Sequence, residues 1–145
     1  MLTCRAGARL CAFELASVVE TMRPLHVESS PGMPEFVAGV SRIRGQPVPV
    51  VDLCRLLGVV ERAPASRLVL LRVGSRHVAV RVESVLGIGM IDDDAAESLP
   101  PLLRDARDAS VTGLAARDAE LLVILSAAKL VPGSGEVSSE APGAA

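Results

Sequence analysis

Short runs of β-branched and aliphatic residues, broken by glycine about every ten residues, dominate the chain. This rhythm is typical of an all-β barrel or sandwich. It predicts strands, most of them in hairpins, over Leu2–Ala6, Leu10–Leu15, Leu25–Glu28, Phe36–Arg44, Val48–Val51, Arg67–Val73, Arg76–Val82, Leu86–Ile91, Val111–Ala116 and Glu120–Leu125. Pro47 and Pro49 have no amide N–H, so their strand must be bulged or lie at an edge there.

Helix is predicted only as short turns. One covers Ala16–Met22 and stops before Pro24, and one covers Leu53–Leu57, between a cap at Asp52 and Gly58. A third is capped by Ser126 and runs to Val131.

Two segments lack a hydrophobic period. Residues 92–107 are acidic and broken by two prolines, which predicts a surface loop outside the folded core. Residues 132–145 consist mostly of Gly, Ser, Pro, Ala and Glu, which predicts a disordered tail. The folded domain is therefore expected to span residues 1–131.

An internal repeat underlies the strand pattern. Residues 5–18 share arginine, glycine, alanine and Ser-Val positions with residues 72–85, and residues 37–57 share a similar pattern with residues 111–131. We interpret this as a duplication, with copies over residues 2–58 and 67–131 and a linker over 59–66. Each copy is too small to be well stabilised alone, so two five-strand units are expected to share a core.

Composition excludes several classes of protein. The chain has 145 residues, a net charge of −2 and 1% aromatic residues, so neither the charge nor the stacking surface of a nucleic-acid-binding protein is expected. Uncharged stretches are far shorter than the ~20 residues of a membrane span, and no signal peptide is recognised. The three cysteines show no CxxC spacing. These features predict a cytoplasmic protein with free, mostly buried thiols and no direct insertion into a membrane.

No catalytic or cofactor-binding pattern is found. His26 and His77 lie among apolar residues without metal-ligand spacing, and no GxSxG motif occurs. The GxG at Gly87 lacks a third glycine, and the acidic run at 92–94 lacks the alternation and glycine of an EF-hand. We therefore expect no catalytic residues, no metal site and no cofactor.

One segment, FVAGVSRIRGQPVPVVDLCRLLG over residues 36–58, places a charged Arg44 at the tip of an apolar hairpin. Such an arginine is either a solvated surface residue or a presented multi-donor recognition group. The segment resembles the signature of the CheW family of chemotaxis coupling proteins, through Gly39-Val40, Ile43-Arg44-Gly45 and the VPVVDL run that follows. More loosely, the resemblance extends over residues 2–131 and includes a VxE helical turn at Val18–Glu20.

The resemblance implies an all-β fold of two interleaved five-stranded SH3-like barrels with short helical turns. It also implies a non-enzymatic adaptor that couples chemoreceptor cytoplasmic tips to the regulatory domain of a CheA-type histidine kinase. The partner-binding residues it implies are Val18, Glu20, Gly39, Val40, Ile43, Arg44 and Gly45.

By the same resemblance, an ion pair between Glu20 and Arg44 is expected, with a role in orienting the arginine. Two alternatives stay open: an adaptor of a non-flagellar chemosensory pathway, and a small-molecule-binding β-barrel.

Overall fold

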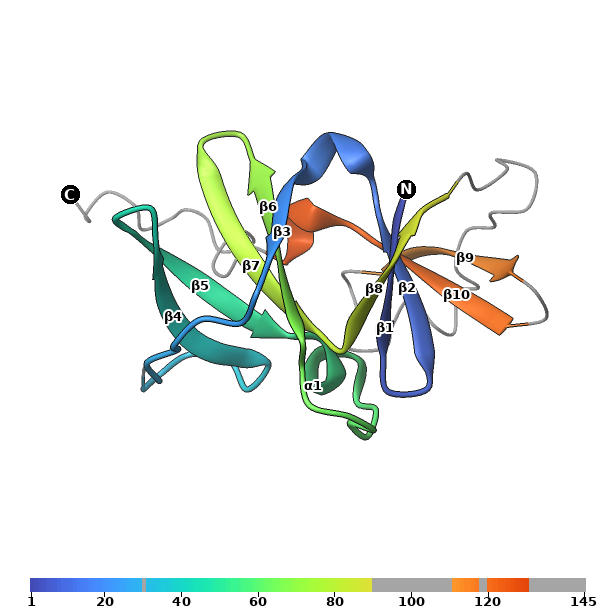
Figure 1. Ribbon diagram of the computed structural model, residues 1–145, viewed down its shortest axis with the longest axis horizontal. Coiled ribbons are helices and arrows are strands. Elements are labelled where there is room, and N and C mark those ends of the chain that lie inside the picture. Colours follow the sequence, from blue (N-terminus) through green and yellow to red (C-terminus); the bar gives the residue numbers. More distant parts are fainter. Residues whose placement is uncertain (30, 90–110, 118–119, 131–145) are drawn as a thin grey trace.

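Within residues 1–29, 31–89, 111–117 and 120–130, which the computed structural model describes, ten strands form two five-stranded sheets (Figure 1). The first sheet has the order β8 (Ser84–Ile88), β1 (Leu2–Ala6), β2 (Arg9–Phe13), β10 (Glu120–Leu125) and β9 (Val111–Arg117). The second has the order β3 (Val18–Met22), β6 (Arg67–Val73), β7 (Arg76–Val82), β5 (Gln46–Asp52) and β4 (Val37–Ile43). Three short helices, η1 (Leu15–Ser17), α1 (Leu53–Leu57) and η2 (Ala127–Lys129), complete the described chain.

The two sheets interleave along the sequence. The middle of the chain supplies the second sheet, and both ends supply the first, so the chain crosses between sheets after β2 and again after β7. Each sheet contains one parallel pair, β2·β10 in the first and β5·β7 in the second. The predicted all-β class with two interleaved five-stranded SH3-like units is confirmed, although the units are sheets and not closed barrels.

The strand orders of the two sheets coincide when strand numbers are shifted by five. In terms of the predicted duplication, each sheet combines the first two strands of one copy with the last three of the other. This exchange accounts for the interleaving. The duplication itself stays a prediction.

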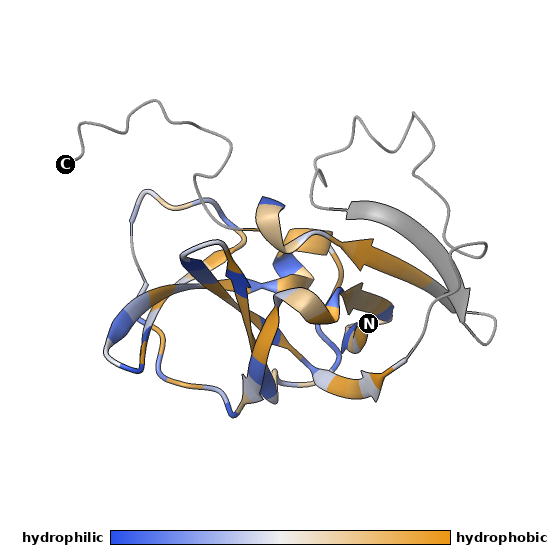
Figure 2. Ribbon diagram, turned by 90° about the horizontal axis from the view of Figure 1, so that it is seen from above, coloured by the Kyte–Doolittle hydropathy of each residue, from blue (hydrophilic) through white to orange (hydrophobic). Residues whose placement is uncertain are grey.

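The largest core lies between the sheets. Phe13 from the first sheet and Val80 from the second belong to it, together with Leu53 of α1 and Leu130 after η2. A full burial of such a side chain contributes roughly 1.5–3 kcal/mol, so this shared core joins the sheets firmly. The expectation of a shared core is confirmed. Figure 2 shows hydrophobic colour where the sheets meet and hydrophilic colour at the outer turns.

Each sheet also buries its other face. The second sheet has a core of its own, formed by Ile43, Val48, Val50, Leu68, Leu70 and Ala79. The first has a smaller cluster of Leu10, Ala12, Leu122 and Ile124.

The predicted helical turn over Ala16–Met22, and with it the VxE turn at Val18–Glu20, is wrong. Only η1 is helical, and Val18–Met22 forms β3, which pairs with β6. Val18, Val19 and Thr21 are β-branched, and branched side chains favour a pleated strand. The predicted strand Leu25–Glu28 is reduced to a single bridge between Glu28 and Val40, and the predicted strand Leu86–Ile91 corresponds to β8.

The predicted caps of α1 are confirmed, and the predicted cap of η2 is not. Asp52 caps α1, because its Oδ1 accepts a hydrogen bond from the Arg55 N–H, and Gly58 ends the helix with φ of 70°. Ser126 occupies the N-cap of η2, but its side chain makes no capping hydrogen bond, so that part of the prediction is wrong. The predicted acidic loop over 92–107 and the predicted tail over 132–145 lie outside the described residues.

Candidate functional site

Arg44 and Gly45 form the two-residue turn between β4 and β5, closed by the pair Ile43 and Gln46. Both turn residues have positive φ, 54° for Arg44 and 80° for Gly45, as a type I′ hairpin turn requires. Among the described residues, Arg44 is the only one other than glycine with positive φ. The left-handed conformation costs an ordinary residue roughly 1–2 kcal/mol, so the hairpin holds a strained arginine at its tip.

Glu20 anchors the Arg44 guanidinium. Glu20 belongs to β3 and Arg44 follows β4, so their ion pair joins the two outermost strands of the second sheet. The Arg44 side chain remains 68% exposed, whereas the Glu20 Oε2 that it contacts is shielded from solvent. The expected pairing of Glu20 with Arg44 is confirmed. An arginine held in this way presents its remaining donors outward in a fixed direction.

Gly39 and Val40 hold the segment before β4 in place. The N–H of Val40 donates to the Glu28 carbonyl, and the Glu28 N–H donates back to the Val40 carbonyl. Gly39 has φ of 150°, and a Cβ there would lie 2.1 Å from the Glu28 carbonyl oxygen. Gly39 therefore permits a close backbone approach that a side chain would block.

The remaining predicted site residues are spread over the two cores. Ile43 is buried in the core of the second sheet, and Val18 is half-buried against the shared core. Of the predicted set, the structure brings Glu20, Arg44 and Gly45 together at one surface, while Gly39, Val40, Ile43 and Val18 support the backbone around it.

Exposed apolar side chains lie along the segment that contains Glu20. Leu15, Val19 and Leu25 are each between 41% and 43% exposed, on η1, on the outermost strand β3 and just after it. Val19 was not expected to be exposed on a strand because residues 16–22 were predicted to be helical, whereas Leu15 and Leu25 were predicted to lie in strands without being recognised as exposed. With the correct strand period, the alternation along β3 would have placed Val19 on the outer face.

Ser41 is a second residue that the sequence analysis missed. It is buried on β4, and its Oγ donates a 2.6 Å hydrogen bond to the His26 carbonyl. Together with the bridge from Val40 to Glu28, this bond fastens residues 26–28 along the edge of β4. Its alternation with Gly39 and Ile43 was the signal that could have indicated an inward-facing position.

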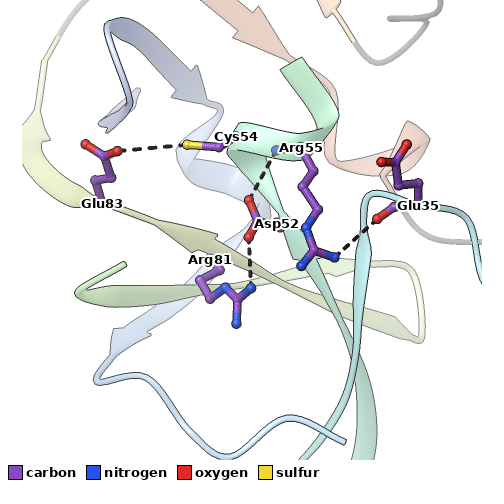
Figure 3. A network of polar contacts seen from close by, with 6 residues as sticks. All are labelled: Glu35, Asp52, Cys54, Arg55, Arg81 and Glu83. Carbon is purple, nitrogen blue, oxygen red and sulfur yellow. Dashed lines mark hydrogen bonds and ion pairs between the residues drawn. The ribbon is translucent and has the colours of Figure 1, made fainter. Parts of the chain in front are cut away.

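A polar network surrounds α1 (Figure 3). Asp52 Oδ2 accepts a 2.8 Å bond from the Arg81 guanidinium, and this pair ties the end of β5 to β7. Arg55 on α1 reaches the Glu35 carbonyl. The network fixes the helix at the end of β5, with the Asp52 and Arg81 charges paired with each other and the Arg55 guanidinium bonded to a backbone carbonyl oxygen.

Glu83 lies where the chain crosses from β7 to β8, and it is buried. Its carboxylate accepts hydrogen bonds from the N–H groups of Arg62 and Ala63 and faces the Cys54 thiol. Burial alone would raise the pKa of Glu83, but hydrogen bonds from the backbone of Arg62, Ala63 and Gly7 outweigh it and lower the pKa below its ordinary value. The predicted linker is thus held by a buried carboxylate.

The cysteines are free and buried, as predicted. Burial raises the pKa of Cys4 to about 12 and that of Cys54 to about 11, and it also raises the pKa of Cys11. Thiols of this kind remain protonated and are poor nucleophiles at neutral pH. Within the described ranges, no group of three or more His, Cys, Asp or Glu side chains is arranged to hold a metal ion.

A hollow of about 510 Å³ opens between the two sheets. Arg72, Val73 and Gly74 at the end of β6 form one wall, and Leu125 and Ser126 after β10 form another. Residues of both sheets therefore contribute to its walls.

Comparison with known proteins identifies the family. The model of the CheW-like domain matches residues 1–134. The chain belongs to the CheW family. CheW family proteins are non-enzymatic scaffolds, which confirms the prediction that this chain is not an enzyme. The CheW-like fold is seen directly in the scaffolding protein TtCheW of Thermoanaerobacter tengcongensis, with a TM-score of 0.74, 25% identity and coverage of 86% of each chain.

Three curated relatives show how this CheW-like chain compares in length. The chain is 36% identical to protein FrzA of Myxococcus xanthus over 60% of its own length and 54% of FrzA. It is 24% identical to the probable chemotaxis protein CheW of Rhizobium etli over 86% of this chain and 82% of that protein. It is 29% identical to protein PilI of Pseudomonas aeruginosa over 68% of this chain and 57% of PilI. The chain thus matches little more than half the length of FrzA and PilI.

Among the residues that the structure describes, no helix is both long and apolar enough to cross a bilayer.

Proposed function

We propose that this CheW-like scaffold couples the cytoplasmic tips of chemoreceptors to the regulatory domain of a CheA-type histidine kinase, in the cytoplasm at membrane receptor arrays. The observation that carries the proposal is the anchored Arg44. Its backbone is strained, its guanidinium is held by a shielded carboxylate oxygen, and most of its side chain faces solvent. Strain of this kind persists where the surrounding structure enforces it, and it is concentrated at functional positions.

In this proposal, the kinase regulatory domain binds the hairpin surface, which we define as Glu20, Arg44 and Gly45. A pre-oriented arginine loses little side-chain freedom on binding, and arginines of this kind are frequent hot spots in interfaces. The buried Ile43 and the backbone contacts of Gly39 and Val40 keep the hairpin in the orientation that the partner meets.

In the same proposal, the receptor tip binds in the hollow between the sheets and against the adjacent apolar residues. A receptor tip is a helical hairpin, and an apolar stripe on a helix can lie in a groove. Leu15 and Val19 are exposed near this side of the molecule, since η1 and β3 both contact β6, whose end lines the hollow. The adaptor then acts by holding two partners in one geometry, and signal passes as a population shift in the kinase.

Direct binding tests the proposal. Isothermal titration of the full chain with a purified receptor tip and, separately, with a kinase regulatory domain should give one binding event each. Arg44→Ala should weaken the kinase interaction by about 2 kcal/mol and leave receptor binding unchanged. Failure of the wild-type chain to bind either partner would reject the proposal.

The output of the pathway is a separate question. FrzA, PilI and the probable chemotaxis protein CheW are all relatives, so the adaptor of a non-flagellar chemosensory pathway stays an alternative within the same proposal. A small-molecule-binding barrel is less well supported, because apolar side chains fill the core of the second sheet. Receptor and kinase genes beside the gene for this chain, with or without flagellar genes, would separate the two pathways.

A further inference from the structure

A groove of about 390 Å³ lies between the start of β5 and the start of β7. Residues 46–49 of β5 form one side, and residues 75–77 form the other. The two strands are parallel neighbours, but their pairing begins only at Val50 and Ala79. Upstream of this point the strands diverge and leave the groove open.

Two prolines explain why the ladder stops there. Both backbone groups of Val40 bond to Glu28, so Val40 and its β5 partner Pro49 form a non-hydrogen-bonded pair. The backbone of Pro49 therefore faces β7, where a ladder would require an N–H that proline lacks. Pro47 is two residues earlier, faces the same way and has the same deficit. β5 lies inside its sheet, but before Val50 its side towards β7 is unpaired, which agrees with the bulge or edge predicted at Pro47 and Pro49.

The opposite side of the groove offers backbone groups to a ligand. Val73 and Arg76 close the two-residue turn between β6 and β7, which makes them a hydrogen-bonded pair. The next pair, Arg72 with His77, is then non-hydrogen-bonded, so the N–H and C=O of His77 point towards β5. Because the prolines stop the ladder, these groups face the groove.

Positive charge surrounds the groove. Arg76 lines it, Arg72 lies opposite His77 in the hairpin, and Arg42 lies opposite Pro47. Arg42, Arg72 and Arg76 are exposed, and the Arg42 guanidinium donates a hydrogen bond to the Gly45 carbonyl. This concentration is local, since the chain as a whole carries a net charge of −2.

We propose that this groove binds an extended acidic peptide segment of a partner protein. The peptide backbone pairs with His77 as an added strand, and its carboxylates meet the arginines of the two hairpin tips. A nucleic acid fits the surface poorly, because the chain has no Trp or Tyr, Phe13 is buried and Phe36 is partly buried. The inference does not depend on the proposed coupling function.

Fluorescence anisotropy with a labelled octaglutamate peptide tests it, with octaglutamine as the neutral reference and the full chain as the receptor. Octaglutamate should bind, and its affinity should fall as salt rises. The double variant Arg72→Glu/Arg76→Glu should weaken binding by about tenfold or more. Arg67→Glu, which makes one of these charge reversals at the far end of β6, should have little effect.

A second variant separates the shape of the groove from its charge. Pro49→Val supplies the missing N–H, lets β5 pair with β7 further upstream and narrows the groove, while the net charge is unchanged. It should weaken octaglutamate binding by about fivefold or more, with thermal denaturation confirming that it folds. If Pro49→Val does not fold, Pro47→Val serves in its place.

Three results would overturn the proposal: unchanged affinity in the folded proline variant, equal binding of octaglutamine, or tighter binding of a single-stranded RNA oligonucleotide at the same residues. Amide chemical shifts that move at residues 46–48 and 75–78 on addition of octaglutamate would support it. Shifts confined to other residues would count against it.

Discussion

Arg44 and Glu20 connect the two strands that lie furthest apart in the second sheet. The order of that sheet places β3 at one edge and β4 at the other, so the ion pair spans its open side. The pair sits at a solvent-exposed tip, where such interactions contribute only ~0–1 kcal/mol. Its consequence is therefore the direction of the arginine and not the stability of the sheet.

The strained turn predicts how substitutions of Arg44 change the free energy of unfolding. Asn adopts positive φ more readily than Ala or Arg, so Arg44→Asn should be more stable than Arg44→Ala by about 1 kcal/mol. Arg44→Ala should itself lie within ~1 kcal/mol of the wild-type chain, because only the exposed ion pair is lost. Urea denaturation measures all three. An Arg44→Ala variant more stable than Arg44→Asn would show that the turn is not strained.

Gly39 and Gly87 offer a matched pair for testing the close approach of Glu28. Both have positive φ, 150° and 128°, but a Cβ at Gly39 would meet backbone at 2.1 Å, whereas nothing lies within 4 Å of one at Gly87. Gly39→Ala should therefore destabilise the fold by roughly 2 kcal/mol or more beyond Gly87→Ala. Equal losses in urea denaturation would mean that backbone conformation, and not the approach of Glu28, determines the cost.

The buried Glu83 predicts a pH-dependent contribution to stability. Its folded pKa is lower than its ordinary value of 4.5, so its contribution is fully present above that value and is lost as the pH falls through the folded pKa. Glu83→Gln should cost about 1.5–3 kcal/mol at pH 7, and the difference from the wild-type chain should shrink in acid. Glu61→Gln, an exposed neighbour in the same linker, is the control. A difference that is constant from neutral pH to acid would contradict the assignment.

The three thiols should react slowly in the folded protein. Cys4 and Cys11 are fully buried opposite each other in the β1–β2 hairpin, and burial raises the pKa of each. Labelling with a thiol reagent at pH 8 should therefore proceed only as the structure opens, and should be fast in urea. Rapid native labelling of Cys4 or Cys11 would show that the first hairpin is not stably packed.

Local patterns were sufficient for most of the fold. Alternating apolar residues and glycine turns located the hairpins, and Asp52 with Gly58 marked both ends of α1. They failed over residues 18–22, where β-branched residues and pairing with β6 outweigh a helical reading. The local pattern is ambiguous in such a short run, and long-range pairing decides it.

The site was predictable only in part, for a physical reason. The pairing of Glu20 with Arg44 followed from a family resemblance and not from spacing, because the two residues meet only when the second sheet has formed. Glu83 could not be identified, since its partners come from the linker, the β1–β2 turn and α1. The positive φ of Arg44 was also missed, because Arg44 had been assigned to the end of the strand Phe36–Arg44 and the turn to residues 45–47.

Assembly of receptor tip, adaptor and kinase regulatory domain, measured by sedimentation with wild-type and Arg44→Ala chains, tests the central claim most directly. The variant should keep the wild-type melting temperature, because Arg44 is exposed and its ion pair contributes ~0–1 kcal/mol, yet fail to bring the kinase domain into the complex. Glu20→Gln should show a weaker defect of the same kind, since it releases the guanidinium without removing it. A folded Arg44→Ala chain that assembles all three components as well as the wild type would contradict the account.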